Sequence, residues 1–358
     1  MVKNIFSERI LKLQNSLSMG QSILLSRNSD VFYFSSFINS VPEERSVFLL
    51  IAKETSYLFL QNFLPKPADF PGKIFFGTSS NKLNEHLTQL QNELGLHEIF
   101  LDFENLNIEE FRSISRINTL KINALDKKHI WSIRTKKDAT EIKKIKIANK
   151  ITDQAIAETI KELTIGQTEL EVKRILENKI RQHADCDLAF PSIIAFDQNT
   201  TLPHHQSGNK KLQNGYVVLI DAGAKYQEYC ADMTRTIFFA KKDITNSNQQ
   251  EIKQKEQEFN QILGIVKTAY QKAKALLAQP KIVAADLDLA CRNYITEQGY
   301  GKNFIHTTGH GLGIDIHEQP SIYRTNLTEI VKGMVITIEP GIYLEGKFGV
   351  RWENTVFV

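Results

Sequence analysis

The sequence shows no pattern of a disulfide framework or a membrane span, and we expect no secretion signal. Its 358 residues include only 3 cysteines, Cys186, Cys230 and Cys291, which are far apart, odd in number and without the spacing of a thiolate zinc site. No apolar run approaches the roughly 18 residues that a membrane span needs. Residues 1–20 mix charged and apolar side chains and predict an amphipathic helix rather than a signal peptide. We therefore expect reduced thiols and a cytoplasmic protein.

An excess of charge of one sign is also missing. Lys and Arg total 44 against 41 Asp and Glu, a net charge of +3 that argues against nucleic acid or an anionic membrane as a partner. The hydrophobic share of 42% and the charged share of 24% are ordinary for a globular protein. A chain of this length exceeds most single hydrophobic cores, so two domains are expected.

The pattern of apolar and charged residues changes near residues 131–137, where a charged stretch separates two regions. Residues 1–131 alternate apolar strands, including a hairpin expected at 46–60, with a helix expected at 81–94, and this alternation predicts an α/β domain. Residues 132–358 begin with a long amphipathic helix, followed by a helix with a Thr168–Glu171 capping box. Strands, two further helices and final strands at 334–339 and 349–358 follow.

Five candidate metal ligands occur in the last third of the chain: Asp221, Asp232, His310, Glu339 and Glu353. Taken singly, each has an ordinary explanation, since an Asp after a strand caps a turn and Glu-Pro-Gly is a normal strand exit. Together they form an oxygen-rich set of the kind that holds two divalent cations with a water between them. Four carboxylates buried together without cations would repel one another strongly. The combination therefore predicts a hydrolase.

The phrases around these residues resemble those of the proline-specific peptidases of the pita-bread fold, which include Xaa-Pro aminopeptidases (aminopeptidase P) and Xaa-Pro dipeptidases (prolidases). The resemblance spans residues 132–358. It rests on five phrases: Leu219-Ile220-Asp221-Ala222-Gly223, Ala231-Asp232-Met233-Thr234-Arg235-Thr236, Phe304-Ile305-His306-Thr307-Thr308-Gly309-His310-Gly311, the run from Gly333 to Tyr343, and Gly349-Val350-Arg351. It implies an α+β catalytic domain with a curved, mostly antiparallel sheet and outer helices, preceded by a creatinase/prolidase-type α/β domain at 1–131.

The resemblance also implies roles for the candidate ligands. Asp221 would bind one metal through both oxygens, while Asp232 and Glu353 would bridge the two metals. His310 and Glu339 would hold the second metal. Oxygen-dominated ligation favours Mn²⁺, with Co²⁺ or Zn²⁺ able to substitute.

Three further histidines match positions near the family's active site. His204 and His317 would donate hydrogen bonds to the substrate carbonyl and the developing oxyanion, although outside the motif His204 would be an ordinary loop histidine. His306 would lie behind the ligands, next to His310. His205 is interpreted as structural.

The implied reaction is attack of a metal-activated water on the bond preceding proline. Glu339 would accept the water proton and pass it to the proline nitrogen. We expect an aminopeptidase, with a dipeptidase as the alternative. A dipeptidase needs a basic group for the terminal carboxylate of its substrate, and Arg351 is a candidate that could equally pair with an acid of the site.

Other readings of the same pattern are weaker. The long N-terminal region and Leu202-Pro203-His204 argue against a methionine aminopeptidase, and the complete ligand set argues against a creatinase-like enzyme or an inactive binding protein.

Two features depart from the family pattern. Asn354 follows Glu353 where an Asp is usual, which alters a charge behind the ligand. The chain ends at Val358, where members of the family commonly continue, so the final strand is expected to be an edge or to be completed by a partner.

Because the N-terminal domain packs against a partner's active site in members of the family, a homodimer is expected.

Overall fold

The structure is a computed structural model that describes residues 4–39, 44–45, 47–78, 82–241 and 249–358. It contains two compact units, Met1–Ile133 and Arg134–Val358. Ser46 and Asn81, at the start of the expected hairpin and of the expected helix, lie outside the described residues. None of the described helices combines the length and the apolar character that a membrane crossing requires.

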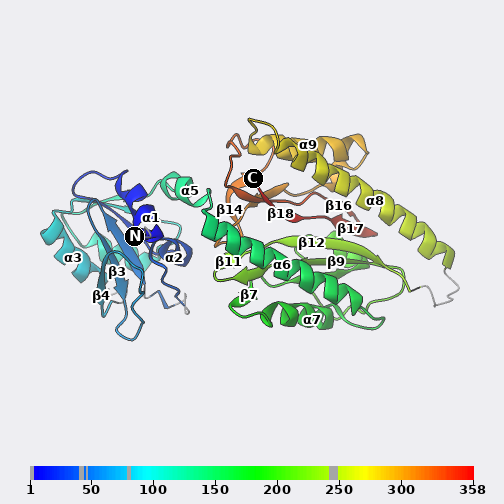
Figure 1. The fold of residues 1–358 in the computed structure, drawn as a ribbon, viewed down its shortest axis with the longest axis horizontal. Coiled ribbons are helices and arrows are strands. Elements are labelled where there is room, and N and C mark those ends of the chain that lie inside the picture. Colours follow the sequence, from blue (N-terminus) through cyan, green and yellow to red (C-terminus); the bar gives the residue numbers. More distant parts are fainter. Residues whose placement is uncertain (1–3, 40–43, 46, 79–81, 242–248) are drawn as a thin grey trace. The chain divides into compact units, whose positions relative to one another are not determined.

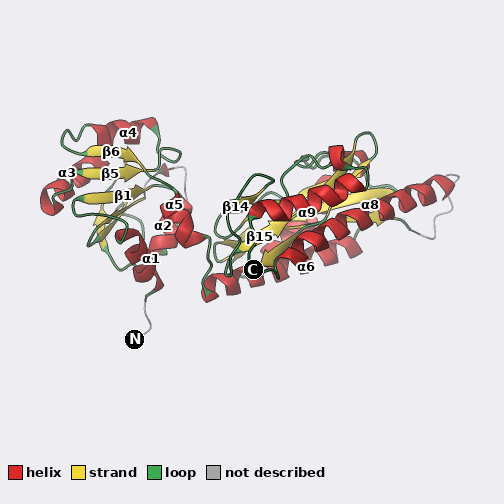
Figure 2. Ribbon diagram, turned by 90° about the horizontal axis from the view of Figure 1, so that it is seen from above, coloured by secondary structure: helices red, strands yellow, loops and turns green. Residues whose placement is uncertain are grey.

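The first unit is built on a mixed six-stranded sheet in the order β4-β3-β2-β1-β5-β6. Its strands are β1 (Gln21–Leu25), β2 (Phe48–Ala52), β3 (Ser56–Leu60), β4 (Lys73–Phe76), β5 (Glu98–Leu101) and β6 (Lys121–Ala124). Its helices are α1 (Ile5–Gln14), α2 (Asn28–Ser35), α3 (Leu83–Leu94), α4 (Ile108–Ser115) and α5 (Lys128–Arg134), the last of which runs one residue into the second unit. Figure 2 shows β1, β5 and β6 side by side, and these three strands are parallel.

The expected hairpin is present, because β2 and β3 pair antiparallel with Phe48 opposite Phe59. Both strands are buried at every position, as continuous apolar runs require when both faces of a sheet are covered. The expected strands at residues 73–76 and 98–101 are β4 and β5. Five elements, β1, β6, α2, α4 and α5, were not anticipated, because the two strands have 5 and 4 residues and the helices 8, 8 and 7, too short for a clear hydrophobic period.

The second unit contains antiparallel strands flanked by helices. Its helices are α6 (Ala139–Lys161), α7 (Glu169–Arg181), α8 (Gln249–Leu276) and α9 (Ala284–Glu297), with short 3₁₀ turns η2 (Asp197–Thr201) and η3 (Gly301–Asn303). Its strands are β7 (Cys186–Leu188), β8 (Ile193–Phe196), β9 (Tyr216–Ala222), β10 (Ala224–Tyr226), β11 (Tyr229–Cys230), β12 (Met233–Phe239), β13 (Gly309–Gly311), β14 (Glu318–Ile322), β15 (Val335–Ile338), β16 (Gly341–Leu344), β17 (Phe348–Arg351) and β18 (Asn354–Phe357). They form sheets in the orders β11-β10-β7, β12-β9-β8, β14-β13-β15-β18 and β16-β17.

Two hydrophobic cores hold this unit together. In one, buried residues of α6 and α7 pack on β8, β9 and β12, and Ile151, Leu176 and Ile220 are among them. In the other, α8 and α9 pack on β15 to β18, with Ile262 and Val350 both fully buried. In Figure 1, α8 and α9 lie on a different side of the strands from α6 and α7. The expected α+β class with a mostly antiparallel sheet is confirmed.

Local signals in the sequence correspond to local structure in this unit. Thr168 accepts a hydrogen bond from Glu171 N at 3.2 Å, while the Glu171 side chain accepts from Thr168 N at 2.7 Å, which is the expected capping box of α7. The single strand expected at 349–358 is instead two strands, β17 and β18. Glu353 lies in the break between them, and β18 occupies one end of its four-stranded sheet.

A buried ion cluster joins the start of this unit to the loop before β14. Glu318 accepts hydrogen bonds from Arg134 Nη2 and, at 3.0 Å, from Lys137 Nζ, and all three side chains are 1% exposed. Arg134 also reaches Asp315 Oδ2 at 2.8 Å. Although burial opposes its charge, the cations Arg134 and Lys137 hold the pKa of Glu318 at about 2. Removing one partner of such a cluster leaves the others as buried unpaired charges.

We predict that Glu318→Gln lowers the free energy of unfolding of this unit by about 3–5 kcal/mol, because Arg134 and Lys137 lose their shared counter-charge. For a unit of this size the loss corresponds to a fall of roughly 10 °C in melting temperature, measurable by calorimetry. Glu329→Gln, at an exposed site, is the matched control and is expected to change it by about 1 °C or less. Equal melting temperatures for the two variants would contradict the prediction.

The same ion cluster predicts a pH dependence. The folded pKa of Glu318 is about 2, below the ordinary value of 4.5, so its stabilisation is fully present above pH 4.5 and is lost as the pH falls toward 2. We therefore expect the difference in melting temperature between the wild type and Glu318→Gln to shrink over this range. A difference that stays constant from pH 7 to pH 3 would show that the carboxylate charge is not the source of the stability.

Candidate metal centre

The five candidate ligands come from five separate segments of the second unit. Asp221 is the last residue but one of β9, and His310 is the middle residue of β13. Asp232 lies between β11 and β12, Glu339 directly follows β15, and Glu353 lies between β17 and β18. All five are held at or beside strand ends, where the backbone is fixed by sheet hydrogen bonds.

Strand pairing brings Asp221 and Glu353 to the same neighbour, Thr234 on β12. Asp221 is directly opposite Thr234 in the β9–β12 ladder. Glu353 N donates to the Thr234 carbonyl at 3.2 Å, and Thr234 Oγ1 donates to Glu353 Oε2 at 2.6 Å. Glu353 is therefore fixed to the sheet that carries Asp221, although the strands before and after it, β17 and β18, belong to two other sheets.

A second set of contacts gathers the other ligands. His310 Nε2 lies 3.5 Å from Glu339 Oε1 and 3.6 Å from Asp232 Oδ2. Thr337 Oγ1 accepts from His310 N at 3.0 Å and lies 3.4 Å from Glu339 Oε1, to which it donates. One ligand atom each of Asp232, His310 and Glu353 lies within 4.8 Å of the others.

The glycines around His310 have a steric purpose. A Cβ at Gly309 would lie 2.2 Å from the Thr337 carbonyl oxygen, and one at Gly311 would lie 2.2 Å from that of Gln319. Either contact is impossible, so only glycine lets β13 lie between β14 and β15. The flanking glycines therefore allow His310 to be brought against Glu339 and Asp232.

Arg351 is the cation of the cluster. It is 3% exposed, and its Nη2 donates to Asp221 Oδ2 at 2.7 Å. Its other nitrogens donate to Thr234 Oγ1 at 3.0 Å, to the Tyr343 hydroxyl at 3.0 Å and to the Pro203 carbonyl at 3.4 Å. Of the two uses of Arg351 that the sequence left open, the structure contains the pairing with an acid.

Burial dominates the electrostatics of the cluster. It raises the pKa of Asp232 and Glu353 well above their ordinary values, and the neighbouring carboxylates add to the effect. Burial also raises the pKa of Glu339 to about 7, against the opposing charge of Arg351. The pKa of His310 is lowered to about 4 by burial, so its imidazole is neutral, the form that binds metals.

The donor set fits divalent cations. Asp221 Oδ1 and Glu353 Oε1 are buried and have no hydrogen-bond partner, which is costly for a carboxylate oxygen unless a cation occupies its lone pairs. When ionised, the four carboxylates also carry far more negative charge than Arg351 offsets. Residues of this type, with oxygen donors in excess, suit hard divalent cations.

The structure places the three other candidate histidines around this cluster. The ring of His317 packs on that of His310, with centroids 4.4 Å apart and planes at 72°. Burial lowers the pKa of His317, and the nearby His204 lowers it further. His204 is exposed in the turn after η2.

The ring of His306 is held by hydrogen bonds at both of its nitrogens. Its Nε2 lies 2.8 Å from the Tyr343 hydroxyl and its Nδ1 lies 2.7 Å from the Thr307 carbonyl. Burial lowers its pKa to about 4, so the ring is neutral. His306 thus connects through Tyr343 to Arg351 and on to Asp221.

The sequence interpretation missed Thr234 and Tyr343. Thr234 and Thr236 alternate along β12 and therefore share one face of the strand, in phase with Asp232 just before it, a signal that was available. Threonine is also a common strand former, so the alternation alone does not identify a functional hydroxyl. Tyr343 offered no comparable signal, because its contact with Arg351 depends on the β16–β17 hairpin.

The unusual Asn354 receives a hydrogen bond from Arg235 Nη2 at 2.9 Å. Arg235 also donates to the Glu353 carbonyl at 2.7 Å and lies 3.5 Å from Asp153, which is 64% exposed. Asn354 therefore accepts from Arg235 with a neutral side chain, and the solvent-exposed carboxylate of Asp153 lies near the same guanidinium.

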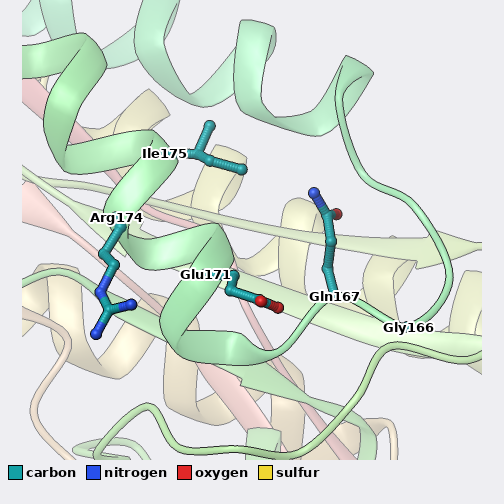
Figure 3. A pocket seen from close by; sticks show the side chains of 5 residues that line it. All are labelled: Gly166, Gln167, Glu171, Arg174 and Ile175. Atoms are coloured by element: carbon teal, nitrogen blue, oxygen red, sulfur yellow. The ribbon is translucent and has the colours of Figure 1, made fainter.

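A surface groove elsewhere on this unit contains none of the candidate residues. It lies at the start of α7 and is lined by Gly166, Gln167, Glu171, Arg174 and Ile175 (Figure 3). The candidate ligands and histidines are thus at or near the buried cluster and not in this groove.

Comparison with known proteins identifies the family. The sequence pattern of metallopeptidase family M24 matches residues 143–358. An uncharacterized peptidase of Staphylococcus aureus is 33% identical over 332 residues, covering 92% of this chain and 89% of its own. A Xaa-Pro dipeptidase of Pyrococcus horikoshii is 31% identical over 367 residues, covering 99% and 95%.

A solved structure shows the same architecture. The X-Pro aminopeptidase of Thermotoga maritima superposes with a TM-score of 0.82 at 30% identity, covering 97% of this chain and 95% of that one. The buried ligand cluster, the fold and these matches agree: the chain belongs to metallopeptidase family M24 and is a metal-dependent peptidase of the pita-bread fold.

Proposed function

We propose that the chain is a Xaa-Pro aminopeptidase, which hydrolyses the peptide bond preceding proline and releases the N-terminal residue. The observation that carries the proposal is the buried cluster of carboxylates with two orphaned oxygens, Asp221 Oδ1 and Glu353 Oε1. Proline specificity is supported by the relatives, one named a Xaa-Pro dipeptidase and another an X-Pro aminopeptidase.

In this proposal Asp221, Asp232, His310, Glu339 and Glu353 hold two divalent cations. The cations would supply the charge that the four carboxylates lack, together with a water whose pKa is lowered toward neutral. The predominance of oxygen ligands favours Mn²⁺, with Co²⁺ or Zn²⁺ able to substitute.

Glu339 is the proposed proton carrier. Its side chain is 17% exposed, against 11% for Asp221 and 8% for Asp232, so it is the most open of these three to a bound peptide. Its carboxylate would take the proton of the attacking water and deliver it to the proline nitrogen, which has no N–H of its own. Breaking the bond then yields a neutral secondary amine as the leaving group.

His204 and His317 are the proposed donors to the substrate. His317 packs on His310, which places its ring beside a proposed ligand. His204 is exposed and near enough to His317 for its charge to lower the pKa of that ring. Donors at both positions would stabilise the negative charge that develops on the substrate oxygen.

The hydrogen bonds that Arg351 makes within the protein support an aminopeptidase over a dipeptidase. A dipeptidase needs a cation for the terminal carboxylate of its substrate, and Arg351 was the candidate that the sequence offered. The hydrogen bonds of Arg351 to Asp221, Thr234, Tyr343 and Pro203 use all three of its nitrogens. A Xaa-Pro dipeptidase is the second candidate, favoured by the Pyrococcus horikoshii relative that matches 99% of the chain.

We predict that the Mn²⁺-loaded protein cleaves both a Xaa-Pro dipeptide and a Xaa-Pro-Yaa tripeptide before proline. Asp232→Ala should lose roughly 10³-fold or more of this activity, because it removes a shared ligand. Product release is measured by chromatography. Cleavage of the dipeptide alone would make the chain a dipeptidase, and cleavage of neither by metal-loaded protein would refute proline specificity.

We also predict that Asp232→Asn has opposite effects on the metal-loaded and metal-free proteins. Metal content measured by mass spectrometry should fall, and with it the rise in melting temperature on adding Mn²⁺. The metal-free variant should be more stable than the metal-free wild type by about 1–3 kcal/mol, because one of four buried carboxylates is gone. Asp153→Asn, at an exposed site, is the control. Stoichiometric metal in Asp232→Asn would remove Asp232 from the ligand set.

The creatinase/prolidase-type assignment of the N-terminal unit, the homodimer and the cytoplasmic location stay predictions. The first is supported by the Thermotoga maritima structure, which matches 97% of this chain and so includes the N-terminal unit.

A further inference from the structure

Glu169, the first residue of α7, carries a buried carboxylate that is outside the candidate metal centre. It is 0% exposed and accepts four hydrogen bonds. The donors are Phe196 N at 2.8 Å, Asn199 Nδ2 at 2.8 Å, His205 Nε2 at 2.8 Å and Gly208 N at 2.9 Å. All four lie in residues 196–208, the segment that carries His204.

These hydrogen bonds define the shape of the segment. Glu169 Oε1 takes two donors and Oε2 takes the other two, so each oxygen is fully used. Because a carboxylate oxygen only accepts, the Nε2 of His205 carries the proton that it shares with Glu169. Moving the segment would leave a buried charge without partners, which is strongly unfavourable.

The turn around His204 is held on both sides. Before it, the Pro203 carbonyl accepts from Arg351 Nη1 at 3.4 Å, and after it the His205 ring is bound to Glu169. Ser207 Oγ adds two bonds to Ile194, accepting from its N–H at 2.9 Å and donating to its carbonyl at 3.0 Å. Within this well-held turn the His204 side chain is exposed.

We propose that Glu169 is a positioning residue of the reaction, which acts through His205 to hold the Pro203–His205 turn so that His204 faces the substrate. The inference rests on the proposed function, since His204 is the proposed donor. Glu169 touches neither substrate nor metal in this proposal. The rival explanation is that Glu169 only stabilises the fold.

Three substitutions separate these explanations. Glu169→Gln replaces one accepting oxygen by an amide nitrogen, which donates and cannot accept, and His205→Phe removes the ring donor at similar volume. His205→Gln keeps a nitrogen donor and is the rescue variant. Glu171→Gln is the matched control, because Glu171 lies on the same first turn of α7, is exposed and binds Thr168 rather than the His204 segment (Figure 3).

We expect Glu169→Gln and His205→Phe to lower kcat about 10- to 100-fold, because a catalytic donor is displaced. KM should change by about threefold or less, and metal content should stay at the wild-type value. His205→Gln should keep most of the activity, and Glu171→Gln should keep nearly all of it. A purely structural role would instead lower the amount of active protein or its metal content without this split between kcat and KM.

A double-mutant cycle tests whether the effect passes through His204. In a His204→Ala background, Glu169→Gln should cost about threefold or less, because the displaced group is already absent. The same 10- to 100-fold loss with and without His204 would overturn the proposal. If Glu169→Gln does not fold, the cycle is run with His205→Phe.

A readout independent of activity completes the test. Hydrogen exchange at the Phe196 and Gly208 amides should be faster in Glu169→Gln than in Glu171→Gln, and the ring resonance of His204 should shift in nuclear magnetic resonance spectra. Unchanged exchange and an unchanged His204 signal would overturn the proposal. If the wild type cleaves no Xaa-Pro peptide, the proposed function fails, whereas these two measurements still decide whether Glu169 positions His204.

Discussion

Mutual repulsion among four buried carboxylates is the constraint on which the rest of the catalytic unit depends. Asp221, Asp232, Glu339 and Glu353 come from separate segments, and each would be more stable in water. Arg351 offsets part of their charge through its contact with Asp221. In the proposed function, divalent cations would neutralise the remaining negative charge, and their binding would restore the folding stability that the buried carboxylates cost.

The backbone supplies the rigidity that holds such a site together. Sheet pairing fixes Asp221 opposite Thr234, and the bonds between Thr234 and Glu353 join two sheets at that point. On the other side, the Glu339 N–H donates to the Thr308 carbonyl at 2.8 Å, which ties the end of β15 to the segment before His310. Because the ligands sit at strand ends tied across sheets, they cannot relax away from one another.

Buried acids outside the cluster hold the loops that carry histidines. Glu169 binds the segment of His204, and Glu318 binds the Ile314 and Asp315 N–H groups of the loop that leads to His317. A third acid, Asp288 on α9, forms a two-point pair with Arg292, which donates to the His306 carbonyl at 2.9 Å. Three buried carboxylates, those of Glu169, Glu318 and Asp288, thus each accept several hydrogen bonds and help to hold a loop around the candidate metal centre.

The sequence by itself determined the longer elements and the types of the candidate ligands. The capping box at Thr168, the apolar runs of β2 and β3 and the five phrases around the ligands are local patterns, and local patterns reflect local hydrogen bonding and burial. They predicted the fold class, and they contain Asp232, His310 and Glu353, whose side chains each offer one ligand atom within 4.8 Å of the others.

Tertiary structure alone decided which groups meet. Arg351 could bind a substrate or an acid. The hydrogen bond from Arg351 N to Thr236 Oγ1 joins β17 to β12, and the Arg351 side chain binds Asp221 on β9, the strand paired with β12. Likewise, nothing in the sequence connects Glu169 to His205, which lie 36 positions apart, or His306 to Tyr343, which lie 37 apart. Such contacts depend on how strands and loops pack, and no pattern along the chain encodes the distance between side chains that folding brings together.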